Sequence, residues 1–118
     1  ESEGRTFYLC HNNLTWLDAR TYCEAQGRVL AHFDSESQSD EVWAAAAEIS
    51  TTKWSIGLND RDVENDYRWH DQSVPAFAVW ADGQPAHALD WFDCVFLSGG
   101  RWYESNCIEK GNFMCTVP

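Results

Sequence analysis

The side chains of this sequence that are best suited to chemistry are acidic, and they gather in two short segments. The members lie between positions 60 and 66 and between positions 82 and 93: Asp60, Asp62, Glu64, Asp66, Asp82, Asp90 and Asp93. Hard cations such as calcium bind to clustered oxygen ligands, so each segment is a candidate calcium cradle. The same carboxylates could instead form a solvated face that keeps a secreted protein soluble. Both interpretations stay open at this point.

The second segment, ADGQPAHALDWFDC at 81–94, also holds a Gln-Pro pair and one histidine. His87 lies close to Asp82 and Asp90 in sequence, and it could bind zinc or titrate near neutral pH. The other three histidines are at positions 11, 32 and 70, and no His-Glu-x-x-His motif is present. We expect those three to be surface or hydrogen-bonded residues.

Catalytic motifs are missing from the sequence. There is no Gly-x-Ser-x-Gly elbow and no glycine-rich loop of the kind that holds phosphates. Acidic residues are plentiful, but no two of them sit in an apolar setting that would separate their pKa values, as a glycosidase requires. We therefore expect that the protein is not an enzyme.

Charge and hydropathy exclude several partners. Eight Lys and Arg residues against nineteen Asp and Glu residues give a formal net charge of −11. Such a field repels phosphate backbones and anionic lipid surfaces. No run of 18 apolar residues is present. We expect neither nucleic-acid binding nor membrane insertion.

Length and cysteine content indicate one small stapled domain. A chain of 118 residues is the size of a single domain, here 1–118. Five cysteines, none in a Cys-x-x-Cys pair, favour disulfides and an oxidising compartment. The chain starts at Glu1 without a signal segment, so we expect a mature or trimmed secreted or extracellular domain.

The elements expected to position these side chains differ between the two halves. In the first half, RTFYLC at 5–10 predicts a strand. Thr15 followed by Asp18 predicts the start of a helix that ends at Gly27. Ser37 or Ser39 could cap a second helix with an apolar stripe of Val42, Ala46 and Ile49.

In the second half, short aromatic and β-branched runs predict strands. They are WSIGL at 54–58, YRW at 67–69, FAVW at 77–80, DCVFL at 93–97, RWY at 101–103 and FMCTV at 113–117. Trp54, Ile56, Gly57 and Leu58 are expected in the core, and Trp69 and Trp102 should be buried with acceptors for their N–H groups. The longest interval without a predicted strand is 81–91.

Several of these stretches, in this order, resemble the C-type lectin-like domain. They are Cys23 in the first helix, WSIGLND at 54–60, YRWHDQS at 67–73, Gln84-Pro85, Cys94, RWYESNC at 101–107 and FMC at 113–115. The resemblance covers essentially the whole chain. It implies an α+β fold with two helices packed on antiparallel sheets and a long irregular loop region that holds the ligand site.

The resemblance also implies two disulfides, Cys23–Cys115 and Cys94–Cys107. The chain-entropy estimate for loops of these lengths is roughly 4 to 5 and roughly 3 kcal/mol. Cys10 is left over, and an odd cysteine in a secreted protein predicts an interchain bridge, so we expect a disulfide-linked homodimer. A buried free thiol is the alternative. Asn13-Leu14-Thr15 is a glycosylation acceptor sequence, which predicts a glycoprotein.

In sugar-binding members of that family, one calcium is held by a Glu-Pro-Asn or Gln-Pro-Asp motif, by an acid ahead of the third conserved cysteine, and by a Trp-Asn-Asp motif. Here Gln84-Pro85 matches, but oxygen ligands are replaced by Ala86, Phe92 and Tyr103. The usual sugar site is therefore expected to be broken. The remaining ligand-binding candidates of the loop region are Gln84, His87, Asp90, Trp91 and Glu104.

An auxiliary calcium position of the family keeps its three carboxylates, which correspond to Asp60, Glu64 and Asp93. The other two ligand positions correspond to His87 and Phe92, which are poor calcium ligands. We expect weak calcium binding here, with turn hydrogen bonds or solvated charges as the alternative.

The resemblance thus implies an extracellular recognition module that binds glycans or microbial surface ligands, as in innate immunity, through a non-standard long-loop site. The alternative is a protein-binding lectin-like receptor or ligand domain with no dependence on sugar or calcium. Trp91 and Phe92 suit either partner, since an aromatic ring can stack on a sugar or anchor a protein interface.

Overall fold

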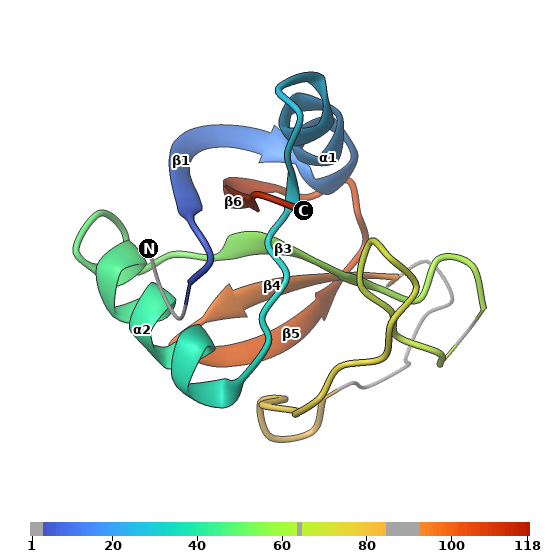
Figure 1. The fold of residues 1–118 in the computed structure, drawn as a ribbon. Helices are drawn as coiled ribbons and strands as arrows, with labels where there is room; N and C mark the ends of the chain where they lie inside the picture. The colour runs from blue at the N-terminus through green and yellow to red at the C-terminus, as the bar shows by residue number, and fades with distance from the viewer. Residues whose placement is uncertain (1–3, 64, 85–92) are drawn as a thin grey trace.

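The computed structural model describes residues 4–63, 65–84 and 93–118. Its elements are β1 (Phe7–Thr15), α1 (Trp16–Ala25), β2 (Val29–Leu30), α2 (Glu36–Ala47), β3 (Trp54–Asn59), β4 (Cys94–Ser98), β5 (Arg101–Ser105) and β6 (Lys110–Thr116). Five strands follow one another across the sheet in the order β1-β6-β3-β4-β5, and β2 pairs with β6 (Figure 1). The predicted α+β class with two helices is confirmed.

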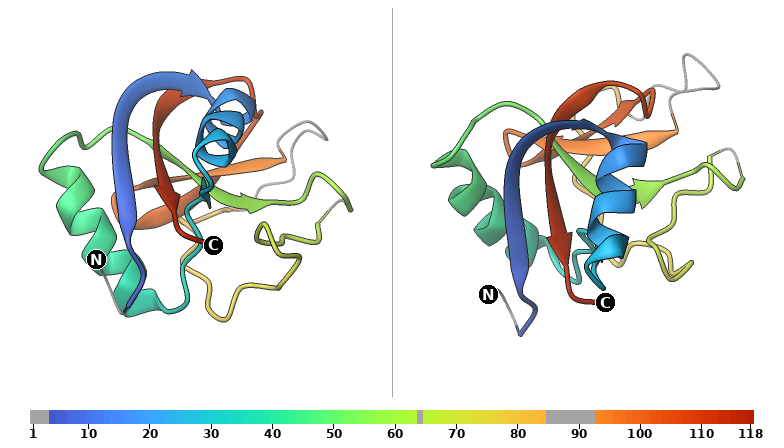
Figure 2. Two further views of the ribbon diagram at one scale, coloured as in Figure 1. Left: turned by 45° about the horizontal axis from the view of Figure 1, so that its top comes forward. Right: turned by 90° about the horizontal axis from the view of Figure 1, so that it is seen from above.

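The sheet is mixed rather than purely antiparallel. The pairs β1–β6, β2–β6, β3–β4 and β4–β5 run antiparallel, but β3 and β6 run parallel, with Trp54 opposite Asn112 and Ser55 opposite Phe113. In Figure 2, β1 and β6 lie side by side and α1 flanks β6. The terminal strands are thus held together, with the central β3 joining them to β4 and β5.

The first helix begins as predicted. The hydroxyl of Thr15 accepts a hydrogen bond from the Asp18 N–H at 3.1 Å, and Trp16, Ala19 and Cys23 form the buried face. The helix ends just before Gly27, whose φ of +73° suits a residue without a Cβ. Thr15 is therefore both the last residue of β1 and the cap of α1.

The predicted cap of the second helix is wrong. Ser35, in an extended conformation, accepts from the Gln38 N–H at 3.1 Å, so the cap lies two residues before Ser37 and α2 begins at Glu36. Ser39 is buried inside the helix. Val42 and Ala46 form the buried stripe, but Ile49 lies beyond the helix end and is 48% exposed.

The core prediction for β3 is confirmed. The side chains of Trp54, Ile56 and Leu58 are fully buried, as are those of Trp69 and Trp102 to within 1%. Gly57 is required by a close approach, because a Cβ there would lie 2.7 Å from the carbonyl oxygen of Leu30. The Trp102 Nε1 atom is buried and has no hydrogen-bond partner among the described residues, so its predicted acceptor is not found there.

The predicted strands YRW and FAVW are wrong. The described residues between Asn59 and Cys94 form only two single bridges outside the named strands, Asn59–Arg68 and Trp80–Trp102. Tyr67, Trp69 and Val79 are buried there. Their aromatic and β-branched pattern therefore reflects packing onto the core and not a strand ladder. The irregular region therefore includes the described residues 60–63 and 65–84, most of which precede the predicted interval of 81–91.

Both implied disulfides are present. Cys23–Cys115 joins α1 to β6 with a Cα–Cα distance of 5.6 Å, and Cys94–Cys107 joins β4 to the segment after β5 at 5.1 Å. The fifth cysteine, Cys10, is free and half-buried on β1. The two bridges involve β6 and β4, which flank the central β3, and all four cysteines belong to one buried cluster.

Candidate functional site

The end of β3 and the start of β4 bring two of the predicted metal-binding acids together. Asn59 pairs with Cys94 across these antiparallel strands, so Asp60 follows β3 beside Asp93, which precedes β4. The Asp60 N–H donates to the Asp93 carbonyl oxygen at 3.0 Å. Strand pairing therefore brings two residues that are 33 positions apart in sequence side by side.

The carboxylates at this position differ in their surroundings. Asp60 is 2% exposed, and its Oδ2 accepts from the Asn65 N–H at 2.9 Å. Asp93 has a buried Oδ1 with no hydrogen-bond partner among the described residues. A buried carboxylate oxygen without a partner is costly, and a bound cation would remove that cost. Glu64, the third acid predicted here, lies outside the described residues.

A second pair from the sequence prediction also comes together, but its oxygens are already used. The Gln84 Oε1 accepts from the Glu104 N–H at 3.2 Å, and the Tyr67 hydroxyl donates to the Glu104 Oε2 at 3.0 Å. Glu104 is only 6% exposed. The side chains predicted to bind ligand are thus tied to the fold of the irregular region. The other candidates, His87, Asp90 and Trp91, lie outside the described residues.

Tyr67 was not predicted as a member of this site. A signal for its contact exists in β5, where side chains alternate between two faces. Trp102 and Glu104 share one face of that strand, and both are buried. Because the aromatic Trp102 must face the core, Glu104 must face it too, and a buried carboxylate needs a donor.

The other face of β5 forms a hollow that the sequence did not reveal. Arg101 and Tyr103 point to this face, and with Trp80, Ala81 and Asp82 they line an open depression of about 480 Å³. The Tyr103 ring stacks on Phe96 with ring centroids 5.3 Å apart, which fixes its orientation. Arg101 and Asp82 are exposed, and Trp80 and Tyr103 are half-buried. The depression therefore offers two aromatic rings, a donor and an acceptor.

Within the part of the chain that the structure describes, no helix has the length and apolar character needed to cross a bilayer.

The fold and these positions define the class of protein. The family model for the Lectin C-type domain matches residues 12–117, and the chain belongs to that family.

Individual relatives show how far the likeness extends. C-type lectin domain family 17, member A, from Homo sapiens is 30% identical over 114 residues, which cover 96% of this chain but only 29% of that relative. The C-type lectin CEL-I from Cucumaria echinata has a TM-score of 0.91 at 24% identity, covering 98% of this chain and 92% of that one. Herring type II antifreeze protein has a TM-score of 0.87 at 25% identity, covering 100% and 94%. The fold therefore serves proteins with different ligands, and it does not select the ligand of this chain.

Proposed function

We propose that this chain is an extracellular recognition domain, and not an enzyme, that binds glycans, including those of microbial surfaces, through a non-standard site in the long-loop region. One observation carries the proposal. Gln84 and Glu104 match the family's sugar-site motifs, and the Gln84 Oε1 accepts from the Glu104 main-chain N–H while the Glu104 Oε2 accepts from the Tyr67 hydroxyl. Their oxygens are therefore a poor fit for the calcium that bridges protein and sugar in the family's usual site.

The depression on β5 supports a glycan ligand that is bound without a metal bridge. Trp80 and Tyr103 line the depression with aromatic surface, against which the apolar C–H face of a sugar ring could pack. Arg101 supplies several N–H donors and Asp82 supplies carboxylate acceptors, a combination that suits sugar hydroxyls. The depression adjoins Gln84 through the chain segment 80–84, so it extends the predicted long-loop site.

A protein ligand is the alternative, and it would need neither sugar nor calcium. Two exposed apolar side chains in the irregular region favour it, since Val63 and Val74 are each 59% exposed. Isolated apolar residues are common on protein surfaces, so they carry less weight than a depression lined by both aromatic and charged groups.

Calcium has a separate place in the proposal. Asp60 and Asp93, together with Glu64, would hold a weakly bound ion at the auxiliary position, and the buried Oδ1 of Asp93 fits such a ligand. The ion would supply charge neutralisation where β3 and β4 meet the irregular region. It would stabilise the domain without contacting the sugar.

A glycan array measured with calcium and again with chelator tests the proposed function. We expect binding that survives chelator and that falls at least tenfold in Arg101→Ala and Tyr103→Ala. Lys110→Ala removes another exposed cation, at the start of β6 and outside the depression, and serves as the matched control. Loss of binding with chelator would contradict the metal-free site, and binding of cell-surface proteins but no glycan would establish the alternative.

We also propose a disulfide-linked homodimer through Cys10. This residue lies on β1, the first strand of the sheet order, where a second copy can approach along the sheet edge. Burial raises the pKa of the Cys10 thiol, and Arg28 lowers it to a smaller extent, so the thiolate forms less readily than at an exposed site. A non-reducing gel should show a dimer for the wild type and only monomer for Cys10→Ala. Monomer in both would refute the bridge.

A further inference from the structure

Two histidines and one aspartate converge at a position that is separate from the predicted calcium positions. His32 lies between β2 and α2, and His70 and Asp71 lie in the turn after Trp69. One candidate ligand atom from each lies within 4.8 Å of the other two. The sequence predicted only surface or hydrogen-bonded roles for these histidines, so the convergence is a property of the fold.

The convergence follows from two attachments to β3. The Gly57 N–H donates to the Ala31 carbonyl oxygen at 2.8 Å, which fixes the segment just before His32. At the end of the same strand, Asn59 and Arg68 exchange backbone hydrogen bonds of 3.1 and 2.8 Å, which fixes the segment before Trp69. The His32 ring then stacks on Trp69 with centroids 4.8 Å apart and planes 9° apart.

The turn that carries His70 and Asp71 is well defined. The Gln72 N–H donates to the Trp69 carbonyl and the Trp69 N–H donates to the Ser73 carbonyl, both at 3.0 Å. The Asp71 Oδ1 accepts from the Ser73 N–H at 3.0 Å and from its hydroxyl at 2.5 Å. These two bonds orient the carboxylate through one oxygen and do not use the other, Oδ2. The His70 ring meets the His32 ring edge-on at 5.3 Å.

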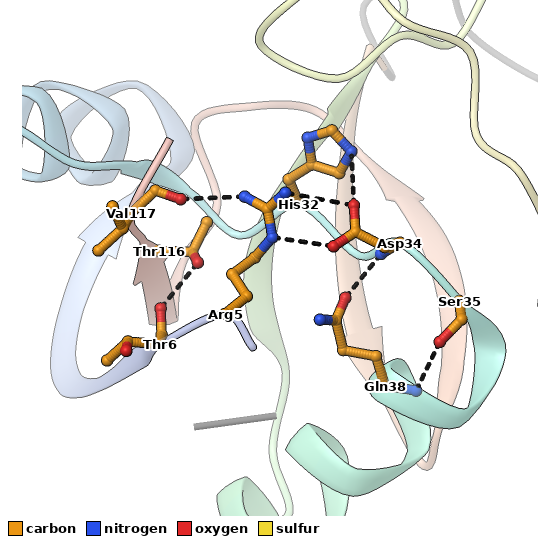
Figure 3. Close-up of polar contacts among 8 residues, drawn as sticks. All are labelled: Arg5, Thr6, His32, Asp34, Ser35, Gln38, Thr116 and Val117. Atoms are coloured by element: carbon orange, nitrogen blue, oxygen red, sulfur yellow. Dashed lines mark hydrogen bonds and ion pairs between the residues drawn. The ribbon is translucent and has the colours of Figure 1, made fainter. Parts of the chain in front are cut away.

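The His32 imidazole has an unmet bonding capacity. The residue is 9% exposed, and its buried Nδ1 has no hydrogen-bond partner among the described residues. Its Nε2 lies 3.7 Å from the Asp34 Oδ1, and Arg5 holds that carboxylate through bonds of 3.0 and 3.2 Å (Figure 3). A carboxylate beside one nitrogen of a metal-bound imidazole is a common supporting contact.

Burial also keeps this imidazole in the neutral form that ligates metals. Desolvation is the largest cause of the lowered pKa of His32. Arg5 and His70 lower it further, whereas Asp71 and Asp34 raise it.

We propose that His32, His70 and Asp71 bind a divalent transition-metal ion of the zinc type. Two imidazole nitrogens with one carboxylate suit zinc and its neighbours, whereas calcium prefers oxygen ligands alone. Ligand atoms around tetrahedral zinc are about 3.3 Å apart, so the cluster must close by about 1.5 Å. The exposed His70 can rotate to do so, and Asp71 can offer the oxygen that Ser73 does not bind, while stacking holds His32 in place. The bound ion would clamp the 69–73 turn to the segment between β2 and α2.

Zinc chloride titrated calorimetrically into the folded chain, with calcium present in excess, tests this site independently of any sugar binding. We expect one ion per chain, a higher Tm with zinc, and no competition from calcium. His70→Ala and Asp71→Asn should each weaken zinc binding about tenfold or more. Both residues are exposed, and Asn keeps an oxygen acceptor for Ser73, so the metal-free Tm should change little.

Two matched histidine controls separate this site from others. His11→Ala removes an exposed histidine on β1, and His87→Ala removes the histidine of the long loop. Both variants should bind zinc as the wild type does. Wild-type affinity in His70→Ala and Asp71→Asn would overturn the proposal, as would loss of zinc binding in His87→Ala alone or the absence of any zinc response.

Discussion

The Asp60–Asp93 position and the Gln84–Glu104 position both lie where the irregular region joins the sheet, but their oxygens are used differently. At the first, the Asp60 Oδ2 accepts from the Asn65 N–H, but the Asp93 Oδ1 has no partner among the described residues. At the second, the Gln84 and Glu104 oxygens accept hydrogen bonds from within the fold. A retained ligand residue therefore indicates a metal site only when its lone pairs are not already used by the fold.

The largest effect that we predict is a loss of stability when the Glu104 hydrogen bond is removed. Tyr67→Phe removes the hydroxyl donor to the buried Glu104 carboxylate, and we expect the free energy of unfolding to fall by about 2 kcal/mol, since hydrogen bonds to charged groups contribute that much. For a domain of this size the Tm should fall by roughly 6 to 12 °C. Urea denaturation measures the change.

Tyr22→Phe is the control for this stability measurement. Tyr22 lies on α1 and is 38% exposed, so its variant should stay within about 0.5 kcal/mol of wild type. Equal stability of the two variants would show that the Glu104 contact contributes nothing.

The next effect concerns calcium at the other position. With a dissociation constant of about 10⁻⁴ to 10⁻³ M, calcium at ten times that value should stabilise the fold by roughly 1.4 kcal/mol. The Tm should then rise by roughly 3 to 6 °C, and magnesium should do much less. Asp60→Asn should abolish the rise while leaving the calcium-free protein folded.

Gln84→Ala is the matched variant for the comparison, because it alters the position whose oxygens are occupied. Its calcium response should equal that of wild type. A lost response in Gln84→Ala and a retained one in Asp60→Asn would reverse the roles of the two positions.

The smallest predicted effect is the calcium-dependent retention of the wild-type protein on sugar resins. Because Ala86, Phe92 and Tyr103 replace oxygen ligands, we expect no calcium-dependent retention on mannose or galactose resin. The variant Ala86→Asp, Phe92→Glu, Tyr103→Asn and Glu104→Asp should gain retention that chelator reverses. Chelator-reversible retention of the wild type would show that the Gln84–Glu104 contact opens for a ligand.

Local chemistry allowed much of the fold to be predicted. Thr15 carries its own capping signal, and the apolar run in β3 must be buried wherever it lies. The disulfide pairing was predicted from the resemblance to the family's motifs, since cysteine spacing alone does not select it. The strands expected at 67–69 and 77–80 were wrong because buried aromatic residues in a packed irregular segment have the same composition as those in a strand.

The candidate site was only partly predictable from the sequence. The family resemblance indicated that Glu104 could bind a ligand, but the Tyr67 donor becomes visible only in three dimensions. The meeting of His32 with His70 depends on two separate hydrogen-bonded attachments to β3, which no local pattern encodes. Sequence therefore identifies candidate ligands, while the fold determines which of their atoms remain available.

The pairing of the terminal strands has a consequence for how the domain is built into larger proteins. Phe7 lies opposite Thr116, and Arg5 donates to the Val117 carbonyl at 2.9 Å as well as to Asp34 (Figure 3). The start of β1 and the end of β6 therefore lie next to each other. A domain whose two ends lie close together can be inserted into a loop of a host protein with little disturbance of either fold. Such a domain spreads readily among proteins of different architecture.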